Sequence, residues 1–369
     1  MIKFTVNTMN SGKLKTLLGI NVDDYVTLFV TKSMCYFILN SMEIYLHKAM
    51  PILLSDNLNE TFSIRVERKK LYNLLIDGYM VFLIDEDTVT ITFKNTENKP
   101  KYSIDIIHQK AFNEVLFNKM NLITKCHEYP EMSLTAIKSL SRVASNLGLP
   151  IGVSNGYAHA GNRMFSCFTQ ASIPDFAVNS RLLVLLLKFT DRVYNVQNYL
   201  IYDEEGTAIV LTKYKDIGYF DTEFVLKQKS SHRVVLNLEN IIDLCGRVEK
   251  SDGTFILDVE NSTAKFEKDK VSYSTPVDIL DIKSASKKKK DEKEKNASLE
   301  DIIAGIDFNS DGAISMSEHN VPTVEIPTIV LTRLLPAMGL KKLVTISYKK
   351  TFMQVNSGKT YVTFARKEV

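Results

Sequence analysis

Tryptophan is absent from the 369-residue chain, and cysteine is scarce. The four cysteines are far apart and form no C-x-x-C pair; they are Cys35, Cys126, Cys167 and Cys245. Neither a disulfide framework nor a zinc ribbon is indicated, because both use closely spaced cysteines. We expect reduced thiols, most of them buried.

Long apolar runs are also missing. The most apolar stretch, LLVLLLKF at residues 182–189, is far too short to span a bilayer. The opening residues, MIKFTVNTMN, lack the apolar core of a signal peptide. The sequence predicts a cytoplasmic protein without a membrane partner, located in a bacterium or, if a phage encodes it, in the cytoplasm of the host.

Motifs that carry catalysis are not found in the sequence. It contains no G-x-S-x-G or H-E-x-x-H, and GKT at residues 358–360 lacks the upstream glycine of a P-loop. None of the six histidines stands at metal-ligand spacing from a cysteine or an aspartate. We therefore predict a protein that is not an enzyme and requires no cofactor.

A strong excess of one charge is lacking as well. Lys and Arg total 46 against 43 Asp and Glu, which leaves a net charge of +3. Net charge alone does not indicate nucleic-acid binding, so any basic surface must arise from an uneven distribution of the charges.

The chain does contain a unit that recurs six times: a short strand, a helix and three further β-like runs. The first unit begins with KFTV at residues 3–6. The six helices are expected at residues 10–19, 68–78, 133–148, 180–189, 239–246 and 327–339. The alternative is coincidence, since this order of elements is common.

One such unit cannot bury both its helix and its sheet, so the units should pair. Six units then form three domains of an α+β protein. Their predicted bounds are 1–115, 125–228 and 229–369, and the third is interrupted by an insert at 283–320.

Local chemistry supports the predicted helices. Ser133, Ser180 and Asn237 stand where N-cap residues are expected. Gly148, with Pro150 just beyond it, suits the left-handed position that ends a helix.

Positive charge recurs on the predicted helices, whereas acidic residues concentrate in turns such as IDED and YDEEG. Cations spread over one surface suit sequence-independent contact with duplex phosphates, although solvated helix faces are the alternative. No recognition helix or zinc finger that would read bases is present. The predicted DNA-facing residues are Lys13, Lys15, Arg68, Lys69, Lys70, Lys138, Arg142, Arg181, Lys188, Arg247 and Arg333.

Nearly the whole chain resembles a known family, the bacterial-type DNA sliding clamp, which is the beta subunit of DNA polymerase III. The resemblance rests on the opening MIKFTV, the six units, DFAVNSRLLVLLLKF at residues 175–189 and the ending YVTFARKEV. The chain is similar to a divergent member, of cellular or phage origin.

The resemblance implies a head-to-tail homodimer that closes into a ring of clamp domains, with helices lining the hole and sheets outside. Such a ring encircles duplex DNA as a processivity factor. It tethers the replicative DNA polymerase, and the polymerase and the clamp loader bind it through short peptides.

The resemblance also implies a pocket for partner peptides. The loop SNGYAHA stands in place of the family's DGHRLA-like loop and supplies Tyr157 and His159. The C-terminal strand supplies Val362, Thr363 and Phe364. For Tyr157 and Phe364 the alternative is that they are ordinary core aromatics.

The insert has two parts. KSASKKKKDEKEKNAS, at residues 283–298, is dense in alternating charge and is typical of a solvated linker. DFNSDGAISMSE, at residues 307–318, has the spacing of a calcium-binding loop, with Gly312 at the sharp turn. The predicted ligands are Asp307, Asn309, Asp311, Ala313 through its carbonyl, Ser315 and Glu318.

Two observations leave the calcium site open. Pro322 leaves little room for an exiting helix, and no second loop is present with which the first would pair. The alternative is a polar surface turn. A calcium-stabilised, multi-domain β-rich structural or virion assembly protein is accordingly the second hypothesis for the function.

We expect the double variant Asp307→Ala and Glu318→Ala to abolish calcium-dependent heat in a calorimetric titration, because it removes two carboxylate ligands. Ring formation should be unaffected. Loss of the dimer in this variant would mean that the insert is structural.

Overall fold

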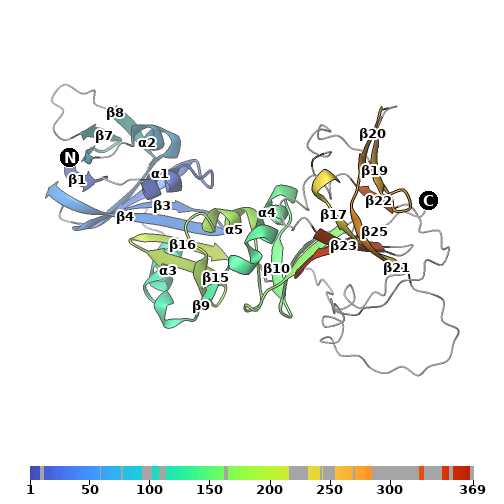
Figure 1. Cartoon of the computed structure of the whole chain (residues 1–369). Coiled ribbons are helices and arrows are strands. Elements are labelled where there is room, and N and C mark those ends of the chain that lie inside the picture. Colours follow the sequence, from blue (N-terminus) through green and yellow to red (C-terminus); the bar gives the residue numbers. More distant parts are fainter. Residues whose placement is uncertain are drawn as a thin grey trace. The chain divides into compact units, whose positions relative to one another are not determined.

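The computed structural model describes most of the chain (Figure 1). The described residues are 1–8, 12–58, 60–75, 78–93, 102–107, 114–161, 165–215, 232–241, 243, 254–268, 271–284, 324–327, 343–348 and 352–365. The chain divides into two compact units, residues 1–163 with 167–220, and residues 164–166 with 221–369. The first contains most of the first two predicted domains; the division into three domains stays a prediction.

The first two repeats show the expected order of strand, helix and three strands. The elements of the first are β1 (Ile2–Asn7), α1 (Gly12–Leu18), β2 (Tyr25–Val30), β3 (Met34–Asn40) and β4 (Ile44–Asp56). Those of the second are β5 (Phe62–Glu67), α2 (Arg68–Leu74), β6 (Tyr79–Ile84), β7 (Thr88–Phe93) and β8 (Tyr102–Ile107).

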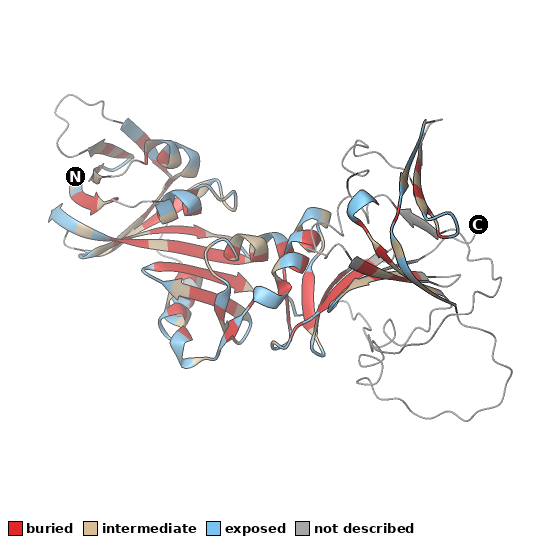
Figure 2. Ribbon diagram, in the orientation of Figure 1, coloured by how far each residue is buried: buried red, intermediate tan, exposed pale blue. Residues whose placement is uncertain are grey.

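The core of these repeats follows from the strand and helix periods. Phe4 of β1 stacks on Phe82 of β6 with ring centroids 5.1 Å apart. On α1, Leu14, Leu17 and Leu18 are fully buried, at the spacing of one helix face. Figure 2 shows the buried positions along the strands and on one side of the helices. Each such side chain contributes roughly 1.5–3 kcal/mol of burial free energy.

Strand β4 is 13 residues long and connects two parts of the first unit. One of its edges pairs with β3. The other pairs with β16 (Thr207–Thr212) over residues 44–48 and with β1 over residues 52–56. The resulting strand order is β1-β6-β7-β8-β5-β2-β3-β4-β16-β15-β14-β9.

The third and fourth repeats have the expected order as well. The elements of the third are β9 (Glu131–Ser133), a 3₁₀ helix (Thr135–Ile137), α4 (Lys138–Leu147), β10 (Ile151–Ser154), β11 (Tyr157–Gly161) and β12 (Phe165–Gln170). Those of the fourth are β13 (Phe176–Val178), α5 (Ser180–Leu186), β14 (Arg192–Val196), β15 (Tyr199–Glu204) and β16. Strand β10 pairs with both β11 and β13.

Two of the predicted N-cap residues, Ser133 and Ser180, lie near the start of their helices but are not the N-caps. Asn179 caps α5, with its side chain accepting from the amide of Arg181, while Ser180 donates to a backbone carbonyl. Ser133 ends β9, and its hydroxyl accepts from Thr135 at the start of the 3₁₀ helix. Ser, Thr and Asn compete for such positions, so neighbouring candidates are hard to separate by sequence. Gly148 ends α4 with φ of 68°, as predicted.

A helix that the repeat does not predict connects the second and third repeats. It is α3 (Glu114–Thr124), followed by a 3₁₀ helix, η1 (Cys126–Glu128). Leu116 and Ile123 pack in a buried cluster with Ala208 and Val210 of β16. Because alternate residues of a strand point to opposite faces, Ile209 and Leu211 face the other side. Strand β16 is therefore buried on both faces.

In the second unit the structure describes nine strands: β17 (His232–Asn237), β18 (Thr254–Asp258), β19 (Thr263–Lys268), β20 (Val271–Pro276), β21 (Ile279–Ser284), β22 (Val324–Pro327), β23 (Leu343–Tyr348), β24 (Phe352–Ser357) and β25 (Thr360–Ala365). Their orders are β25-β24-β23-β17-β21 and β20-β19-β18-β22. The side chain of Asn237 accepts from the amide of Glu239, as its predicted cap role requires.

Strand β21 was not predicted, and its last two residues, Lys283 and Ser284, overlap the charged linker that the sequence predicts to begin at residue 283. Val235 of β17 lies opposite Asp281, and Lys283 and Ser284 extend the same pairing. Most of the predicted linker and the whole calcium loop lie outside the described residues. Within the described part of the chain, no helix is long and apolar enough to cross a membrane.

The three described cysteines, Cys35, Cys126 and Cys167, are free and buried, as predicted. Burial raises the pKa of the Cys167 thiol to about 12.

Arg68, the first residue of α2, binds the end of α1. Its guanidinium donates to the carbonyl of Leu18 at 2.7 Å, the carbonyl of Asp23 at 2.6 Å and the side chain of Asn21 at 2.9 Å. A cation at a helix C-terminus also meets the negative end of the helix dipole. Arg68 thus holds the two helices of the first repeat pair together.

We expect Arg68→Ala to lower the free energy of unfolding by about 1–3 kcal/mol, because it leaves three acceptors without their donor. The matched control is Lys69→Ala on the exposed neighbouring position of α2, which should change it by less than about 0.5 kcal/mol. Equilibrium urea denaturation measures both. Equal losses would show that the bonds of Arg68 contribute nothing specific.

Candidate nucleic-acid interface

The structure places most of the predicted DNA-facing cations on or directly beside four short helices of the first unit. Lys13 and Lys15 lie on α1, three cations lie on α2, two lie on α4, and Arg181 lies on α5 with Lys188 just past its end. Arg247 and Arg333 lie outside the described residues.

Helices α1, α2 and α5 line two adjoining clefts. The first, about 710 Å³, has Lys15, Arg181 and Lys188 around a lining that includes Leu182 and Leu185. The second, about 720 Å³, has Arg68 and Lys69 together with Asp24 and Glu67 in its wall. Both contain Gly19, Asn21 and Tyr72, so they form one continuous channel. We call this channel, with its four cations Lys15, Lys69, Arg181 and Lys188, the basic groove.

The cations of the basic groove are available for a ligand. Within the described residues, no carboxylate forms an ion pair with any of the four. Lys69, Arg181 and Lys188 are exposed. The ammonium of Lys15 lies 6.0 Å from the centroid of the Tyr72 ring, which is cation–π distance and leaves its charge uncompensated.

Arg181 also approaches the end of α4. A Cβ added at Gly148 would lie 3.7 Å from its guanidinium. The carbonyls at a helix C-terminus favour a cation, so this position suits the charge of Arg181.

Three other predicted cations are already engaged. Lys13 forms an ion pair of 2.6 Å with Glu205, and this hydrogen bond raises the pKa of Lys13 and lowers that of Glu205. Lys70 pairs with Glu67 at 3.1 Å. Arg68 donates to α1, as described above. These residues are less suited to a phosphate than the sequence suggests, because each already has an acceptor.

Glu205 receives two lysines because of the turn that carries it. Glu205 and Gly206 connect β15 to β16 with φ of 52° and 69°, the left-handed geometry of a tight hairpin. The carbonyl of Glu205 accepts from Lys48 of β4 at 2.6 Å, while its carboxylate binds Lys13. These two contacts therefore hold the β15–β16 hairpin of the fourth repeat against the first repeat.

Helix α4 presents a separate pair of cations. Lys138 is half-buried and Arg142, one turn later, is exposed, whereas Leu140, Val143 and Ala144 are buried. Among the residues that the structure describes, neither cation is in an ion pair.

The residues predicted to form the partner pocket lie partly in the first unit and partly in the second. In the first, Tyr157 of β11 is half-buried and meets Phe168 edge-on at 6.2 Å, and His159 is 5% exposed. In the second, Val362 is fully buried and Thr363 accepts from Gln354. Val362 thus contributes to the core of its sheet. The side chain of Phe364 lies outside the described part, and the pocket stays a prediction.

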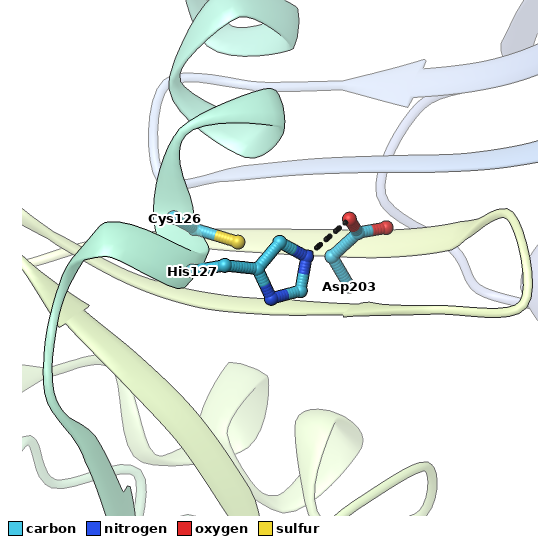
Figure 3. A group of neighbouring side chains, drawn as sticks. All are labelled: Cys126, His127 and Asp203. Atoms are coloured by element: carbon cyan, nitrogen blue, oxygen red, sulfur yellow. Dashed lines mark ion pairs between the residues drawn. The ribbon is translucent and has the colours of Figure 1, made fainter.

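One cluster of metal-binding residue types was not indicated by spacing along the sequence. His127, at η1, lies beside Cys126 and faces Asp203 of β15 (Figure 3). The adjacent letters C and H were the only local signal, because Asp203 is far along the chain.

Comparisons by sequence find nothing: no family model and no curated protein matches the chain. Solved structures do match. The chain is similar to the DNA polymerase III beta subunit of Thermotoga maritima (10% identity, TM-score 0.65), to a DNA polymerase sliding clamp of Pseudomonas aeruginosa (14%, 0.64) and to the DNA polymerase beta subunit of Streptococcus pyogenes (13%, 0.65).

Each of these likenesses covers 100% of both chains. At such low identity a structural likeness establishes the fold alone. The chain has, over its full length, the fold of the bacterial DNA polymerase III beta subunit, the sliding clamp.

Proposed function

We propose that the protein is a DNA sliding clamp: a non-catalytic processivity factor that encircles duplex DNA and tethers a replicative polymerase. The observation that carries the proposal is the basic groove. Its four cations have no carboxylate partner among the described residues: Lys15, Arg181 and Lys188 gather where α5 meets α1, and Lys69 lines the adjoining cleft between α1 and α2. A near-neutral chain has no structural need for such a concentration of positive charge.

The chemistry of the groove suits phosphates and not bases. Lysine and arginine side chains attract the charged backbone whatever the sequence, and contacts of this kind allow a protein to slide. The sequence contains no recognition-helix or zinc-finger signature that would read bases.

A ring requires a second copy of the chain. The strand pairing between the two repeat pairs of the first unit suggests which strands of the two copies would join. Within the first unit, the fourth strand of the first repeat pair, β4, joins the last strand of the second pair, β16. By the same rule, β20, which ends its four-stranded sheet, corresponds to β4, and β8 corresponds to β16. In β8, residues 106–107 already pair with β5, whereas residues 102–105 pair with β7 alone among the described strands, so residues 102–105 are the part that would receive a further strand. We infer that β20 of one copy pairs with β8 of the next. Repeated twice, this head-to-tail contact closes a dimer.

Polymerase and clamp loader are the proposed partners, and they would dock through short peptides near Tyr157 and the C-terminal strand. The competing hypothesis, a calcium-stabilised structural protein, gains no support, since the structural neighbours named above are polymerase subunits and a sliding clamp.

We expect the double variant Arg181→Ala and Lys188→Ala to weaken binding to short linear duplex DNA. The slope of log affinity against log salt should fall by about 2, since each lost phosphate contact removes roughly 0.9. The matched control is Lys13→Ala with Lys70→Ala, which removes the same charge from residues already in ion pairs and should change the slope by less than about 1. Equal changes in both variants would contradict the role of the groove.

Charge reversal on α4, Lys138→Glu with Arg142→Glu, provides a second test in an assay of topology. Wild-type protein loaded on a nicked circle should remain bound and should be lost after linearisation. The variant should load poorly or leave faster, because the new carboxylates repel phosphates. Equal retention on circular and short linear DNA by the wild type would contradict encirclement.

We further expect a solution mass of twice 41.9 kDa by sedimentation. Ser272→Lys with Ser274→Lys, on exposed positions of β20, should shift the protein towards 41.9 kDa, because lysines along an edge strand oppose pairing. Asn118→Lys with Asn121→Lys on α3 adds the same charge elsewhere and should leave the mass unchanged. A wild-type protein that is monomeric at micromolar concentration would contradict the proposed ring.

A further inference from the structure

Three side chains with different metal-binding atoms converge beside β15, outside the basic groove. Cys126 and His127 belong to η1, directly after α3, and Asp203 belongs to β15. The thiol, an imidazole nitrogen and a carboxylate oxygen all lie within 4.8 Å of one another (Figure 3). Cysteine, histidine and aspartate are the residues that bind zinc in proteins.

The separation of His127 and Asp203 is that of two ligands around one ion. Nε2 of His127 lies 3.4 Å from Oδ2 of Asp203. A charge-assisted hydrogen bond would be shorter, about 2.7–2.9 Å. Two tetrahedral ligands bonded to zinc at about 2.0–2.1 Å stand about 3.3–3.4 Å apart. The observed separation of His127 and Asp203 matches that edge, and the thiol of Cys126 lies within 4.8 Å of both atoms.

A neighbouring residue orients the imidazole. Nδ1 of His127 lies 2.8 Å from the hydroxyl of Tyr194, and the two rings meet edge-on at 4.9 Å. When Nδ1 donates its proton to Tyr194, the lone pair of Nε2 faces Asp203, and the thiol of Cys126 lies beside the ring (Figure 3). Histidines that bind metals are held by an outer partner of this kind.

The surroundings give the site one closed side and one open side. Cys126 is fully buried in the cluster that contains Leu116 and Ile123 of α3. The side chain of Asp203 is 24% exposed and that of His127 is 55% exposed. The protein therefore offers three candidate ligands, two of which are accessible to solvent.

We propose that Cys126, His127 and Asp203 bind one Zn²⁺, with water as the fourth ligand. A thiolate, an imidazole and one carboxylate favour zinc over calcium or magnesium, which prefer oxygen ligands. The ion fastens η1, and with it the end of α3, to the sheet of the third and fourth repeats. It supports the fold and is independent of DNA binding and of the loop at residues 307–318.

The competing explanation is ordinary packing: a buried thiol in an apolar core beside a surface histidine–aspartate pair. It predicts no zinc affinity beyond that of scattered surface side chains. The two explanations differ in stoichiometry, in the presence of a sulfur ligand and in the dependence on Tyr194.

The test is titration of the full chain with Zn²⁺ after chelator treatment, followed by Co²⁺ as a spectroscopic substitute. We expect one equivalent to bind, and the cobalt form to show thiolate-to-metal charge transfer that Cys126→Ser abolishes. Asp203→Asn should weaken binding at least about tenfold, and Tyr194→Phe about 10- to 100-fold through the lost outer bond. Free zinc at 100 times Kd should raise the thermal midpoint by roughly 5–10 °C.

Two matched controls isolate the cluster. Cys167→Ser changes another buried thiol, and Asp307→Ala with Glu318→Ala removes the calcium-loop ligands; both should retain full zinc affinity. If Cys126→Ser does not fold, His127→Ala changes an exposed ligand and serves in its place. Absence of micromolar binding, or equal binding by wild type and His127→Ala, would overturn the proposal.

Discussion

The pairing of β4 with β16 is the constraint on which the arrangement of the first unit depends. An unpaired strand edge carries N–H and C=O groups that need partners, and β4 satisfies those of its second edge with β16 and then with β1. This pairing is made by the backbone, so it tolerates wide changes of side chain. It also accounts for full-length similarity of fold at 10–14% sequence identity.

The same pairing creates the basic groove. It brings the first repeat pair beside the fourth repeat, so α5 comes to line a channel with α1 and α2. The charges on these helices then separate into two groups. Lys13, Arg68 and Lys70 bind protein acceptors, whereas the groove cations do not bind described carboxylates. An ion pair at the surface contributes little to stability, but it removes a cation from use by a ligand.

Helix α3 shows how an addition to a repeat can acquire a role of its own. By covering one face of the sheet it buries β16 on both sides, and by ending just before Cys126 it carries two side chains of the proposed metal site to β15. Its apolar residues Leu116, Met120 and Ile123 are spaced as on one helix face. That signal was present in the sequence, and the regular repeat on either side obscured it.

Local patterns in the sequence by themselves determined most elements of the fold. The order of strand, helix and three strands, the buried face of α1 and the glycine end of α4 depend on residues a few positions apart, so period and capping rules suffice. The errors at Ser133 and Ser180 are small because several residues nearby can cap. Tertiary structure alone decided which side chains meet. Lys13 and Lys15 look alike in sequence, yet Lys13 is engaged by Glu205, 192 residues away. His127 and Asp203 are likewise joined only by the packing of η1 on β15. Such partners are set by strand pairing and helix packing across the chain, which no local pattern records.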